Sequence, residues 1–249
     1  MENRVGIIMA GGNGTRLEPL TNVVNKHLLP VYNKPMIFYP LSTLIRLGHK
    51  IIYLITKKID IPLFKKLLGN GKKYGVKIIY KIQDKPKGIA NCFHILKKEI
   101  RNKDVTLILG DNLFISNFEN LDLTSVKVGC TIVCTTVKKP QNYGVVEIKK
   151  KIISIEEKPK KPKSNLIATG LYFFDNNVVS HLRKIKISKR GEYEITDLSN
   201  EYLKKNKCFN YNLKSTDNWY DLGKIDDLID CANFLNIYQK KRNLEIGNL

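Results

Sequence analysis

The sequence predicts an α/β fold in which helices cover both faces of a mostly parallel sheet, giving three layers in the order α/β/α. Three observations predict it. Strand-like and helix-like segments alternate through the first 110 residues, a glycine-rich turn follows the first strand, and 43% of the 249 residues are hydrophobic. Alternation at this spacing is typical of βαβ units, and this apolar content can close a large core.

The first half is expected to supply the parallel strands and the helices between them. In chain order we expect a strand at 4–9, a helix at 36–47, a strand at 51–56, a helix at 61–68, a strand at 76–82, a helix at 88–100 and a strand at 105–109. Gly48 and Gly69 directly follow the first two helices, where glycine accepts the left-handed conformation that commonly ends a helix. The strand at 51–56 is rich in β-branched residues, which suit a pleated surface.

The pattern changes after about residue 125, where short strands alternate with turns rich in Pro, Asn and Gly. The expected elements are strands at 128–137, 143–148, 152–156 and 166–174, then helices at 194–204 and 224–240. No internal repeat and no Gly/Ser linker separates the two halves. We therefore expect one domain over residues 1–249, with the second half forming the other wall of a cleft.

The chain is strongly basic, with a formal net charge of +20. Its lysines are spread over the whole length, and the densest runs, at 149–151 and 158–163, lie at expected turns without interleaved aromatic residues. Proteins that bind single-stranded nucleic acid stack bases on such aromatic residues. The charge therefore favours small anionic substrates over nucleic acid.

Membrane association and export are not expected either. No apolar run approaches the roughly 18 residues of a spanning helix, and a strand that begins at residue 4 leaves no room for a signal peptide. The five cysteines include no C-x-x-C pair, so we expect them to be reduced residues of the core. These features predict a cytoplasmic protein.

The first strand leads directly into Gly11-Gly-Asn-Gly-Thr-Arg16. Glycines let backbone N–H groups approach phosphate oxygens, and the arginine can bind a pyrophosphate that gains charge as it leaves. Two common motifs do not fit, because the dinucleotide fingerprint needs glycine in place of Leu17 and the P-loop needs Lys-Ser or Lys-Thr after Gly14. A plain glycine turn is the alternative, and we predict a phosphate loop of another type.

The glycine-rich loop is followed by further short segments that are informative together with it. They are Gly11–Leu17, Pro19–Thr21, Asn25–Val31, Lys34–Met36 and Arg190–Asp197. In this order and spacing they resemble the sugar-1-phosphate nucleotidyltransferases, and among these the glucose-1-phosphate thymidylyltransferases, over about residues 4–240. The resemblance implies a Rossmann-like nucleotidyltransferase fold, with a nucleotide-binding half at about 1–125 and a sugar-phosphate-binding half at about 126–249.

The reaction implied by the resemblance transfers a nucleotidyl group from dTTP or UTP to a sugar 1-phosphate, in the first place glucose 1-phosphate. Pyrophosphate leaves, and the nucleotide sugar would supply deoxysugar or glycan synthesis. Such a transfer needs two polyanions held in line and their charge neutralised. By resemblance, the catalytic cations are Lys26 beside the α-phosphate and Arg16 on the departing pyrophosphate.

Asp111 and Asp221 are the expected Mg²⁺ ligands. Asp111 closely follows a buried strand, and open parallel sheets bind ligands at the carboxyl ends of their strands. Mg²⁺ typically takes one or two carboxylates and completes its octahedron with phosphate oxygens and water. Either aspartate alone could equally well cap a turn. Together with the predicted phosphate loop, the two aspartates favour the interpretation as metal ligands.

The nucleotide site implied by the resemblance centres on Gln83 and Gly88. The Gln83 amide offers a donor and an acceptor to the N3–H and O4 of a pyrimidine, and Gly88 would let the backbone approach the base. An exposed loop glutamine is the alternative, and dTTP and UTP both stay open because thymine and uracil share this edge. The expected nucleotide-binding residues are Met9, Gly11, Gly12, Gly14, Thr15, Gln83 and Gly88.

The second half is expected to bind the sugar phosphate. Tyr143–Glu147 and Glu156–Pro159 reproduce segments of the family, and by resemblance Glu157 accepts sugar hydroxyls while Lys158 holds the phosphate. A charged acceptor strengthens each hydroxyl hydrogen bond. The expected sugar-phosphate-binding residues are Asn112, Tyr143, Gly144, Glu157, Lys158, Gly170, Tyr172 and Arg190.

Three features depart from the family pattern. His27 replaces the usual glutamine next to Lys26, and Leu222 and Lys224 alter the usual Asp-x-Gly-Thr segment at Asp221. The sequence ends at residue 249, where longer members continue, so we expect a short form without the C-terminal extension that contributes to their allosteric site and subunit contacts. Feedback inhibition and a homo-oligomer both stay open.

Three other functions remain in view. A related enzyme could use CTP or an amino-sugar phosphate, which substitution of Gln83 and a survey of all four nucleotides would distinguish. An inactive regulatory relative would be free to lose Arg16, Lys26 or Asp111, yet all three are present. A nucleic-acid binder would lose duplex affinity steeply with rising salt. The leading expectation is an enzyme that acts on two small molecules, with Mg²⁺ as its cofactor.

Overall fold

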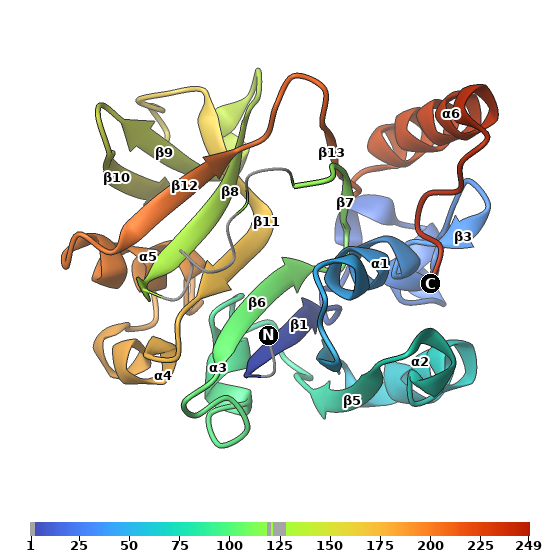
Figure 1. The fold of residues 1–249 in the computed structure, drawn as a ribbon, viewed down its shortest axis with the longest axis horizontal. Coiled ribbons are helices and arrows are strands. Elements are labelled where there is room, and N and C mark those ends of the chain that lie inside the picture. Colours follow the sequence, from blue (N-terminus) through green and yellow to red (C-terminus); the bar gives the residue numbers. More distant parts are fainter. Residues whose placement is uncertain (1–2, 119–120, 122–127) are drawn as a thin grey trace.

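The computed structural model describes residues 3–118, 121 and 128–249. Within these residues a nine-stranded sheet forms the centre of the molecule (Figure 1). Neighbouring strands β6, β1, β4 and β5 run parallel in that order. Their bounds are Asp104–Leu109 for β6, Arg4–Met9 for β1, Ile51–Thr56 for β4 and Lys77–Ile82 for β5. The predicted α/β fold with mostly parallel central strands is confirmed.

Antiparallel strands extend the sheet beyond β6. Strand β11 (Leu166–Phe174) pairs with β6 and leads on to β9 (Gly144–Ile148) and to β10 (Ile152–Glu157) at the end of the strand order. Strand β8 (Cys130–Thr136) also pairs with β11, and β12 (Cys208–Asn212) runs parallel to β8. Both halves of the chain therefore share one sheet. The predicted change of pattern near residue 125 lies outside the described residues.

Two short strand pairs lie apart from the large sheet. Strand β7 (Asn112–Ile115) pairs antiparallel with β13 (Asn218–Asp221), so that Asp221 lies opposite Asn112. Strands β2 (Pro30–Val31) and β3 (Lys34–Pro35) form the other pair. None of these four strands was predicted, and neither was β12.

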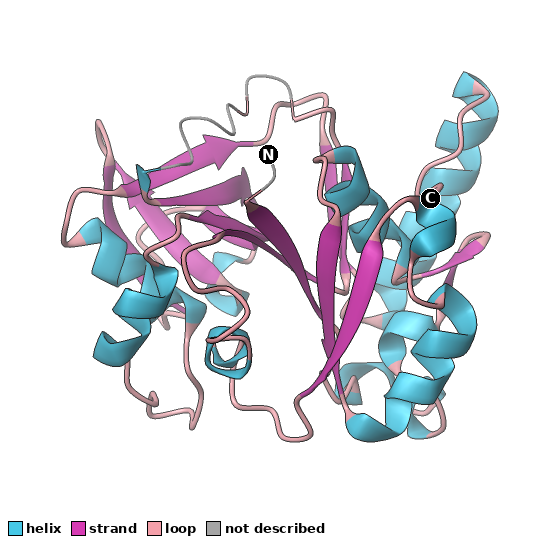
Figure 2. Cartoon of the chain, turned by 60° about the horizontal axis from the view of Figure 1, so that its bottom comes forward, coloured by secondary structure: helices cyan, strands magenta, loops and turns pink. Residues whose placement is uncertain are grey.

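Helices cover both faces of the large sheet (Figure 2). In β1, Ile7 lies in one core with Phe93 and Tyr202, whereas Ile8 lies in a second core with Leu41. Adjacent strand residues point to opposite faces, so α3 and α5 cover one face and α1 and α2 the other. The bounds are Phe38–Arg46 for α1, Ile61–Leu68 for α2, Asn91–Ile95 for α3, Val178–His181 for α4 and Ile195–Leu203 for α5.

The helix expected at 88–100 is shorter than predicted. Regular α-helix ends at Ile95, and hydrogen-bonded turns follow as far as residue 102. Cys92, Leu96 and Ile100 are all fully buried, and the Ile100 N–H donates to the Leu96 carbonyl at 3.0 Å. The apolar period that motivated the prediction is therefore present, although the regular helix covers only its start.

The last helix, α6 (Ile225–Arg242), packs against a third core that includes Leu17, Leu113 and Leu222. The chain then returns to α1, where a Cβ added to Gly247 would lie 2.8 Å from the Tyr39 ring. Within the described residues, no helix combines the length and apolar character needed to cross a membrane.

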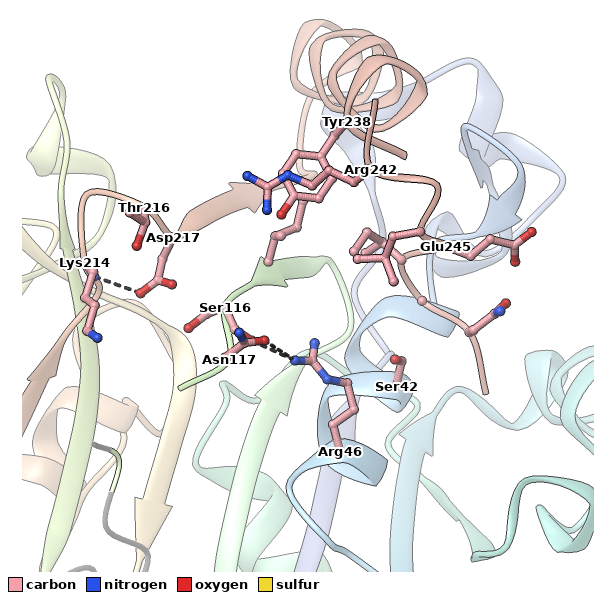
Figure 3. Close-up of a pocket in the computed structure, with 15 residues that line it drawn as sticks. Ser42, Arg46, Ser116, Asn117, Lys214, Thr216, Asp217, Tyr238, Arg242 and Glu245 are labelled. Atoms are coloured by element: carbon pink, nitrogen blue, oxygen red, sulfur yellow. Dashed lines mark hydrogen bonds between the residues drawn. The ribbon is translucent and has the colours of Figure 1, made fainter. Parts of the chain in front are cut away.

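A cavity of about 570 Å³ lies between α1, the end of β7, and the C-terminal segment (Figure 3). Arg46 donates from one nitrogen to the Ser116 carbonyl and to Asn117 Oδ1, both at 3.1 Å. Arg242 reaches the cavity from α6. None of the residues predicted to take part in the reaction lines this cavity, so it is separate from the candidate site described next.

Candidate active site

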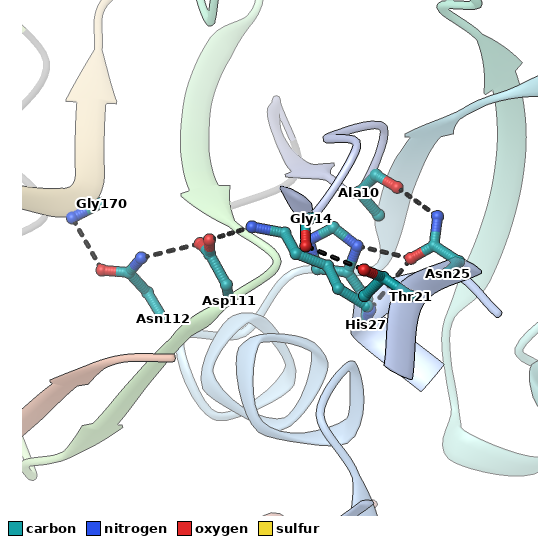
Figure 4. A network of polar contacts seen from close by, with 9 residues as sticks. Ala10, Gly14, Thr21, Asn25, His27, Asp111, Asn112 and Gly170 are labelled. Carbon is teal, nitrogen blue, oxygen red and sulfur yellow. Dashed lines mark hydrogen bonds and ion pairs between the residues drawn. The ribbon is translucent and has the colours of Figure 1, made fainter. Parts of the chain in front are cut away.

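The glycine-rich loop after β1 is held in shape by the segment that follows it. Gly14 has φ 71°, and an added Cβ would lie 2.9 Å from the Thr21 side chain. Thr21 Oγ1 donates to the Gly14 carbonyl at 2.9 Å, and Asn25 Nδ2 donates to the Ala10 carbonyl at 3.0 Å (Figure 4). Both the left-handed backbone and the close side chain therefore require glycine at position 14.

Lys26 and Asp111 form a largely buried ion pair, with side chains 11% and 13% exposed. Lys26 begins a single 3₁₀ turn, and Asn25 caps this turn by accepting from the His27 backbone N–H at 2.9 Å. Burial alone would raise the pKa of Asp111, but the Lys26 ammonium and hydrogen bonds outweigh burial and hold that pKa well below its usual value. Asp111 is therefore a carboxylate at neutral pH.

Asn112 links Asp111 to the second half of the chain. Its Nδ2 donates to Asp111 Oδ1 at 3.0 Å, and its Oδ1 accepts from the Gly170 N–H at 3.0 Å (Figure 4). The same Oδ1 accepts from Trp219 Nε1 at 2.6 Å. A Cβ on Gly170 would lie 2.7 Å from this amide, so only glycine allows the approach. The network fixes the Asp111 carboxylate relative to β11 and β13.

Asp221 reaches the same place through the pairing of β13 with β7. The backbone N–H of Leu222, the residue after Asp221, donates to the Asp111 carbonyl at 2.9 Å. Arg16 lies against Gly223, where an added Cβ would come within 2.5 Å of Arg16 Nη2 and 3.1 Å of Asp221 Oδ1. Burial and the Asp111 carboxylate raise the pKa of Asp221, and Arg16 and Lys26 only partly oppose them. Two carboxylates and two cations thus converge from distant parts of the chain.

Two cavities meet at this cluster, and Ile89, Leu109 and Asp111 line both. The smaller has a volume of about 200 Å³, and the larger about 550 Å³. Predicted residues that line the smaller cavity are Met9, Gly11, Gly12, Lys26, Gln83 and Gly88. Predicted residues that line the larger cavity are Arg16, Asn112, Tyr143, Gly144, Glu157, Lys158, Gly170, Tyr172 and Asp221.

Three predicted residues line neither cavity. Gly14 and Thr15 belong to the bend of the glycine-rich loop. Arg190 is held by carboxylates instead, because its Nη1 lies 3.3 Å from Glu157 Oε1 and 3.2 Å from Glu194 Oε1, and its Nη2 lies 3.6 Å from Glu192 Oε2. Arg190 therefore reaches the larger cavity only through its contact with Glu157.

The smaller cavity has polar groups suited to one edge of a base. Gln83 lines it, and Gln83 Oε1 accepts from Asn91 Nδ2 at 3.0 Å, which orients the amide. Gly88 has φ 88°, and an added Cβ would lie 2.7 Å from Tyr193 N. The close approach that requires glycine at 88 is thus to the Tyr193 backbone, a contact that the sequence did not reveal.

The larger cavity has an aromatic and acidic wall. The rings of Tyr143 and Trp219 meet edge to face with centroids 5.8 Å apart. Burial and the nearby Glu194 raise the pKa of Glu157, with Lys158 and other cations opposing them. Sugar rings offer hydroxyls and a flat apolar face, and this wall provides an acceptor and aromatic rings for them.

His27 follows Lys26 in the chain, lines the smaller cavity and is 1% exposed. Its Nδ1 lies 2.7 Å from Asn25 Oδ1. Because an amide oxygen only accepts, Nδ1 carries the proton of a neutral imidazole. Burial, together with the neighbouring Lys26, lowers the pKa of His27 to about 3. The histidine is therefore neutral, with its Nδ1–H donated to Asn25 and its Nε2 left as an acceptor.

The donors at the cluster fit a hard divalent cation. In the described part of the chain, no group of three or more His, Cys, Asp or Glu side chains is placed to hold a metal. Asp111 and Asp221 provide two carboxylates. The negative charge of Asp111 makes ionisation of Asp221 less favourable and so raises the pKa of Asp221. Mg²⁺ accepts such a small carboxylate set because phosphate oxygens and water complete its coordination.

Several lining residues escaped the sequence analysis. Trp219 lies two residues before Asp221, and this closeness to a predicted metal ligand was the available signal. Ile89 and Leu109 look like ordinary core residues, and Asp227 looks like a helix-start carboxylate. Lys224, which precedes α6, also lines the larger cavity. No local pattern distinguishes Ile89, Leu109 and Asp227 from structural residues, and Lys224 was noted only as a departure from the family pattern.

Comparison with known proteins gives a consistent result. The family model described as nucleotidyl transferase matches residues 5–237. A glucose-1-phosphate thymidylyltransferase of Mycolicibacterium smegmatis is 43% identical over 252 residues, which cover 97% of this chain and 85% of that protein. The enzyme of the same name from Neisseria meningitidis is also 43% identical, with 98% of this chain and 86% of that protein covered.

Solved structures agree with this result. A Bacillus anthracis protein, assigned as a glucose-1-phosphate thymidylyltransferase and solved with a sucrose, superposes with a TM-score of 0.88 at 37% identity and covers 98% of both chains. A UDP-glucose pyrophosphorylase complexed with UDP-glucose shares the fold, with a TM-score of 0.81 at 24% identity over 96% of this chain and 99% of that one. The protein described here therefore belongs to the nucleotidyl transferase family.

Proposed function

We propose that this protein transfers the thymidylyl group of dTTP to glucose 1-phosphate, forming dTDP-glucose and pyrophosphate. The names of the M. smegmatis and N. meningitidis relatives support this choice of substrates. UTP is the alternative nucleotide, because the amide of Gln83 would pair equally with thymine and uracil. Both substrates are small anions of the cytoplasm, where the five free cysteines of this chain would stay reduced.

The observation that carries the proposal is the convergence of charge where two cavities meet. Lys26 and Asp111 lie on the smaller cavity, and Arg16, Asp111 and Asp221 lie on the larger one. Joining a nucleotide to a sugar phosphate requires two polyanions side by side, with their reacting groups at a common point. The junction at Asp111 offers such a point.

The reaction needs little proton transfer from the protein. A phosphate monoester loses its second proton near pH 6, so the oxygen of the sugar phosphate is already a nucleophile at neutral pH. In the proposal, Lys26 stabilises the charge on the α-phosphate as this oxygen attacks, and Arg16 stabilises the pyrophosphate that leaves. Charges fixed before the reaction stabilise the transition state without reorganisation.

Asp111 and Asp221 would hold Mg²⁺ in this proposal. When bound, the ion supplies positive charge to phosphate oxygens and so reduces the repulsion between the two substrates. The Asn112 amide keeps Asp111 in place through its bond at 3.0 Å. Glu157 would accept sugar hydroxyls, and the 3.3 Å contact from Arg190 would orient its carboxylate.

A matrix assay tests the proposal. Purified protein is supplied with each of dTTP, UTP, CTP and ATP against glucose 1-phosphate and amino-sugar 1-phosphates, and released pyrophosphate is measured with and without Mg²⁺. We expect release to require a nucleotide, a sugar phosphate and Mg²⁺ together, and to be fastest with dTTP and glucose 1-phosphate. Asp111→Asn is the inactive control. The absence of release with every pair would refute the proposed reaction.

A further inference from the structure

A hydrogen bond between two amide side chains connects the smaller cavity to helix α3. Asn91 Nδ2 donates to Gln83 Oε1 at 3.0 Å, and the contact is partly buried. Gln83 lines the smaller cavity, whereas Asn91 lines neither of the two cavities of the candidate site. Asn91 can therefore influence a base in the smaller cavity only through its effect on Gln83.

The backbone is held in place on both sides of this amide pair. Gln83 directly follows β5, and its N–H donates to the Thr56 carbonyl at 2.9 Å. Asn91 is the first residue of α3. The Ala90 N–H, just before this helix, donates to the Tyr193 carbonyl at 3.1 Å. Because both backbones are fixed, the two amides meet at one place, and the variable that remains is which end each amide presents.

The observed bond determines which end of Gln83 is available. An amide oxygen only accepts hydrogen bonds, and an amide nitrogen only donates them. Since Oε1 accepts from Asn91, this oxygen has one lone pair left for a ligand. Within the described residues Gln83 Nε2 has no hydrogen-bond partner, and it is not among the unpaired atoms that are closed to solvent. A ligand therefore meets an acceptor on the Asn91 side of the amide and a donor beside it.

This orientation matches one of the two kinds of pyrimidine edge. Thymine and uracil carry N3–H next to the carbonyl oxygen O4, so Oε1 can accept from N3–H while Nε2 donates to O4. Cytosine has an acceptor at N3 and an amino group at C4 in the same places. In the observed orientation, the amide would oppose acceptor to acceptor and donor to donor against cytosine. Polar groups that leave water without a partner weaken binding.

Cytosine could pair only after the Gln83 amide turned end over end. That turn would bring Gln83 Nε2 against Asn91 Nδ2, and two donors cannot bond to each other. The Asn91 donor thus opposes the turn that cytosine requires, because a partly buried donor that loses its acceptor is unfavourable. In this way a residue outside the cavity can favour one base over another.

We propose that Asn91 is a positioning residue that makes the nucleotide site select thymine or uracil over cytosine, by fixing the orientation of the Gln83 amide. The inference rests on the proposed function for its choice of ligand, a pyrimidine nucleotide. It adds the residue that sets the selectivity and the direction in which that selectivity can be changed.

Equilibrium binding tests the inference separately from catalysis. Isothermal titration calorimetry of the full chain with Mg²⁺ gives the Kd of dTTP and of 5-methyl-dCTP, which differ only in the pairing edge of the base. We expect the wild type to bind dTTP more tightly by about tenfold or more. If both amides turned together, the bond would re-form with exchanged roles and the two nucleotides would bind equally. Equal binding by the wild type would therefore overturn the inference.

Asn91→Asp provides the sharper test, because a carboxylate only accepts. Gln83 must then donate Nε2 to the new carboxylate, which places Oε1 where it accepts from the cytosine amino group. The preference for dTTP should fall by about tenfold or more and shift towards 5-methyl-dCTP. Asn91→Leu leaves the Gln83 amide free to turn, so the preference should fall by a smaller factor. A preference that is unchanged in both variants would overturn the inference.

Lys85→Gln is the matched control for charge. Lys85 is exposed, lies two residues from Gln83 and lines neither cavity of the candidate site. Its replacement lowers the net charge by one, as Asn91→Asp does, but leaves both amides in place. The control should change the Kd of both nucleotides by the same factor and keep their ratio. A ratio that falls as far as in Asn91→Asp would overturn the inference, because charge alone would then explain the shift.

Measurements of pyrophosphate release separate this inference from the proposed reaction. With glucose 1-phosphate as acceptor, the ratio of kcat/KM for the two nucleotides should follow the ratio of their Kd values in every variant. A purely structural loss at Asn91 would instead lower both values equally and would overturn the inference. If dTTP is preferred in binding but no nucleotide supports release, the proposed reaction fails and the role of Asn91 stands. Absence of binding by either nucleotide would overturn both.

Discussion

Replacing Gly88 with alanine should destabilise the fold by about 3 kcal/mol, because two separate costs act at this position. Gly88 has φ 88°, and an added Cβ would lie 2.7 Å from Tyr193 N and 2.9 Å from Glu192 Cβ. The Tyr193 backbone is held on both sides, since its N–H donates to the Lys87 carbonyl at 2.9 Å and its carbonyl accepts from the Ala90 N–H at 3.1 Å. The new methyl group must therefore displace a bonded backbone.

The magnitude follows from these two costs. A left-handed conformation costs a residue with a Cβ about 1 kcal/mol, and the loss of two backbone hydrogen bonds costs about 1 kcal/mol each. Gly75 isolates the first cost, because it has φ 72° and an added Cβ would meet nothing within 4 Å. Gly75→Ala should therefore destabilise the protein by only about 1 kcal/mol.

Urea unfolding of the substrate-free protein measures both variants, with the free energy of unfolding extrapolated to water. In a thermal scan, Gly88→Ala should lower the melting temperature by roughly 6–12 °C, given about 2–4 °C per kcal/mol for a domain of this size. Equal losses for the two variants would refute the reasoning, because the contact with Tyr193 would then contribute nothing.

Other predictions concern the charged cluster and a buried histidine. Lys26→Met leaves the Asp111 carboxylate buried without its partner, so pyrophosphate release should fall at least about 100-fold and the melting temperature should also fall; retained release would contradict the assigned role. Asp221→Asn removes the repulsion from Asp111, so it should raise the melting temperature of the metal-free protein. It should also raise the Mg²⁺ concentration needed for half-maximal pyrophosphate release. An unchanged Mg²⁺ dependence would count against Asp221 as a ligand. Burial, together with Arg4, lowers the pKa of His49 to about 4 from 6.5, so below pH 6.5 the unfolded chain takes up a proton that the folded protein excludes. Stability should thus decrease by about 1 kcal/mol between about pH 7.5 and about pH 5.5, and by less in His49→Gln, as urea unfolding at each pH will show.

The parallel half of the fold was predictable because its signals are local. The strands expected at 4–9, 51–56, 76–82 and 105–109 appear within one residue of their observed ends. Strands β1, β4 and β6 are short, mostly apolar runs with buried middles, and a strand buried on both faces needs little else. The edge strand β5 carries two lysines and is only partly buried. The helix at 61–68 ends where Gly69 adopts φ 63°, as expected from a glycine directly after the helix.

The pairing of β7 with β13 was not predictable from local pattern. Each strand has four residues, and more than a hundred residues separate Asn112 from its partner Asp221. The resemblance gave Asp221 its expected role, but only the structure provides the physical reason for its position. The same holds for Arg190, which lies in a turn and whose three carboxylate partners include Glu157 at the end of β10.

The carboxyl-end rule of parallel sheets explains why half of the candidate site could be located from sequence and half could not. Strands β1, β5 and β6 end just before Gly11, Gln83 and Asp111, and all three residues line the smaller cavity. Parallel strands bring their carboxyl ends to one edge, so knowing the strands is sufficient to bring these residues together. The larger cavity instead takes Glu157 and Gly170 from antiparallel strands, where residues from the end or the middle of a strand can face the same space. Their convergence depends on the order β10-β9-β11-β6, and strand order in an antiparallel sheet is set by long-range packing that no single segment encodes.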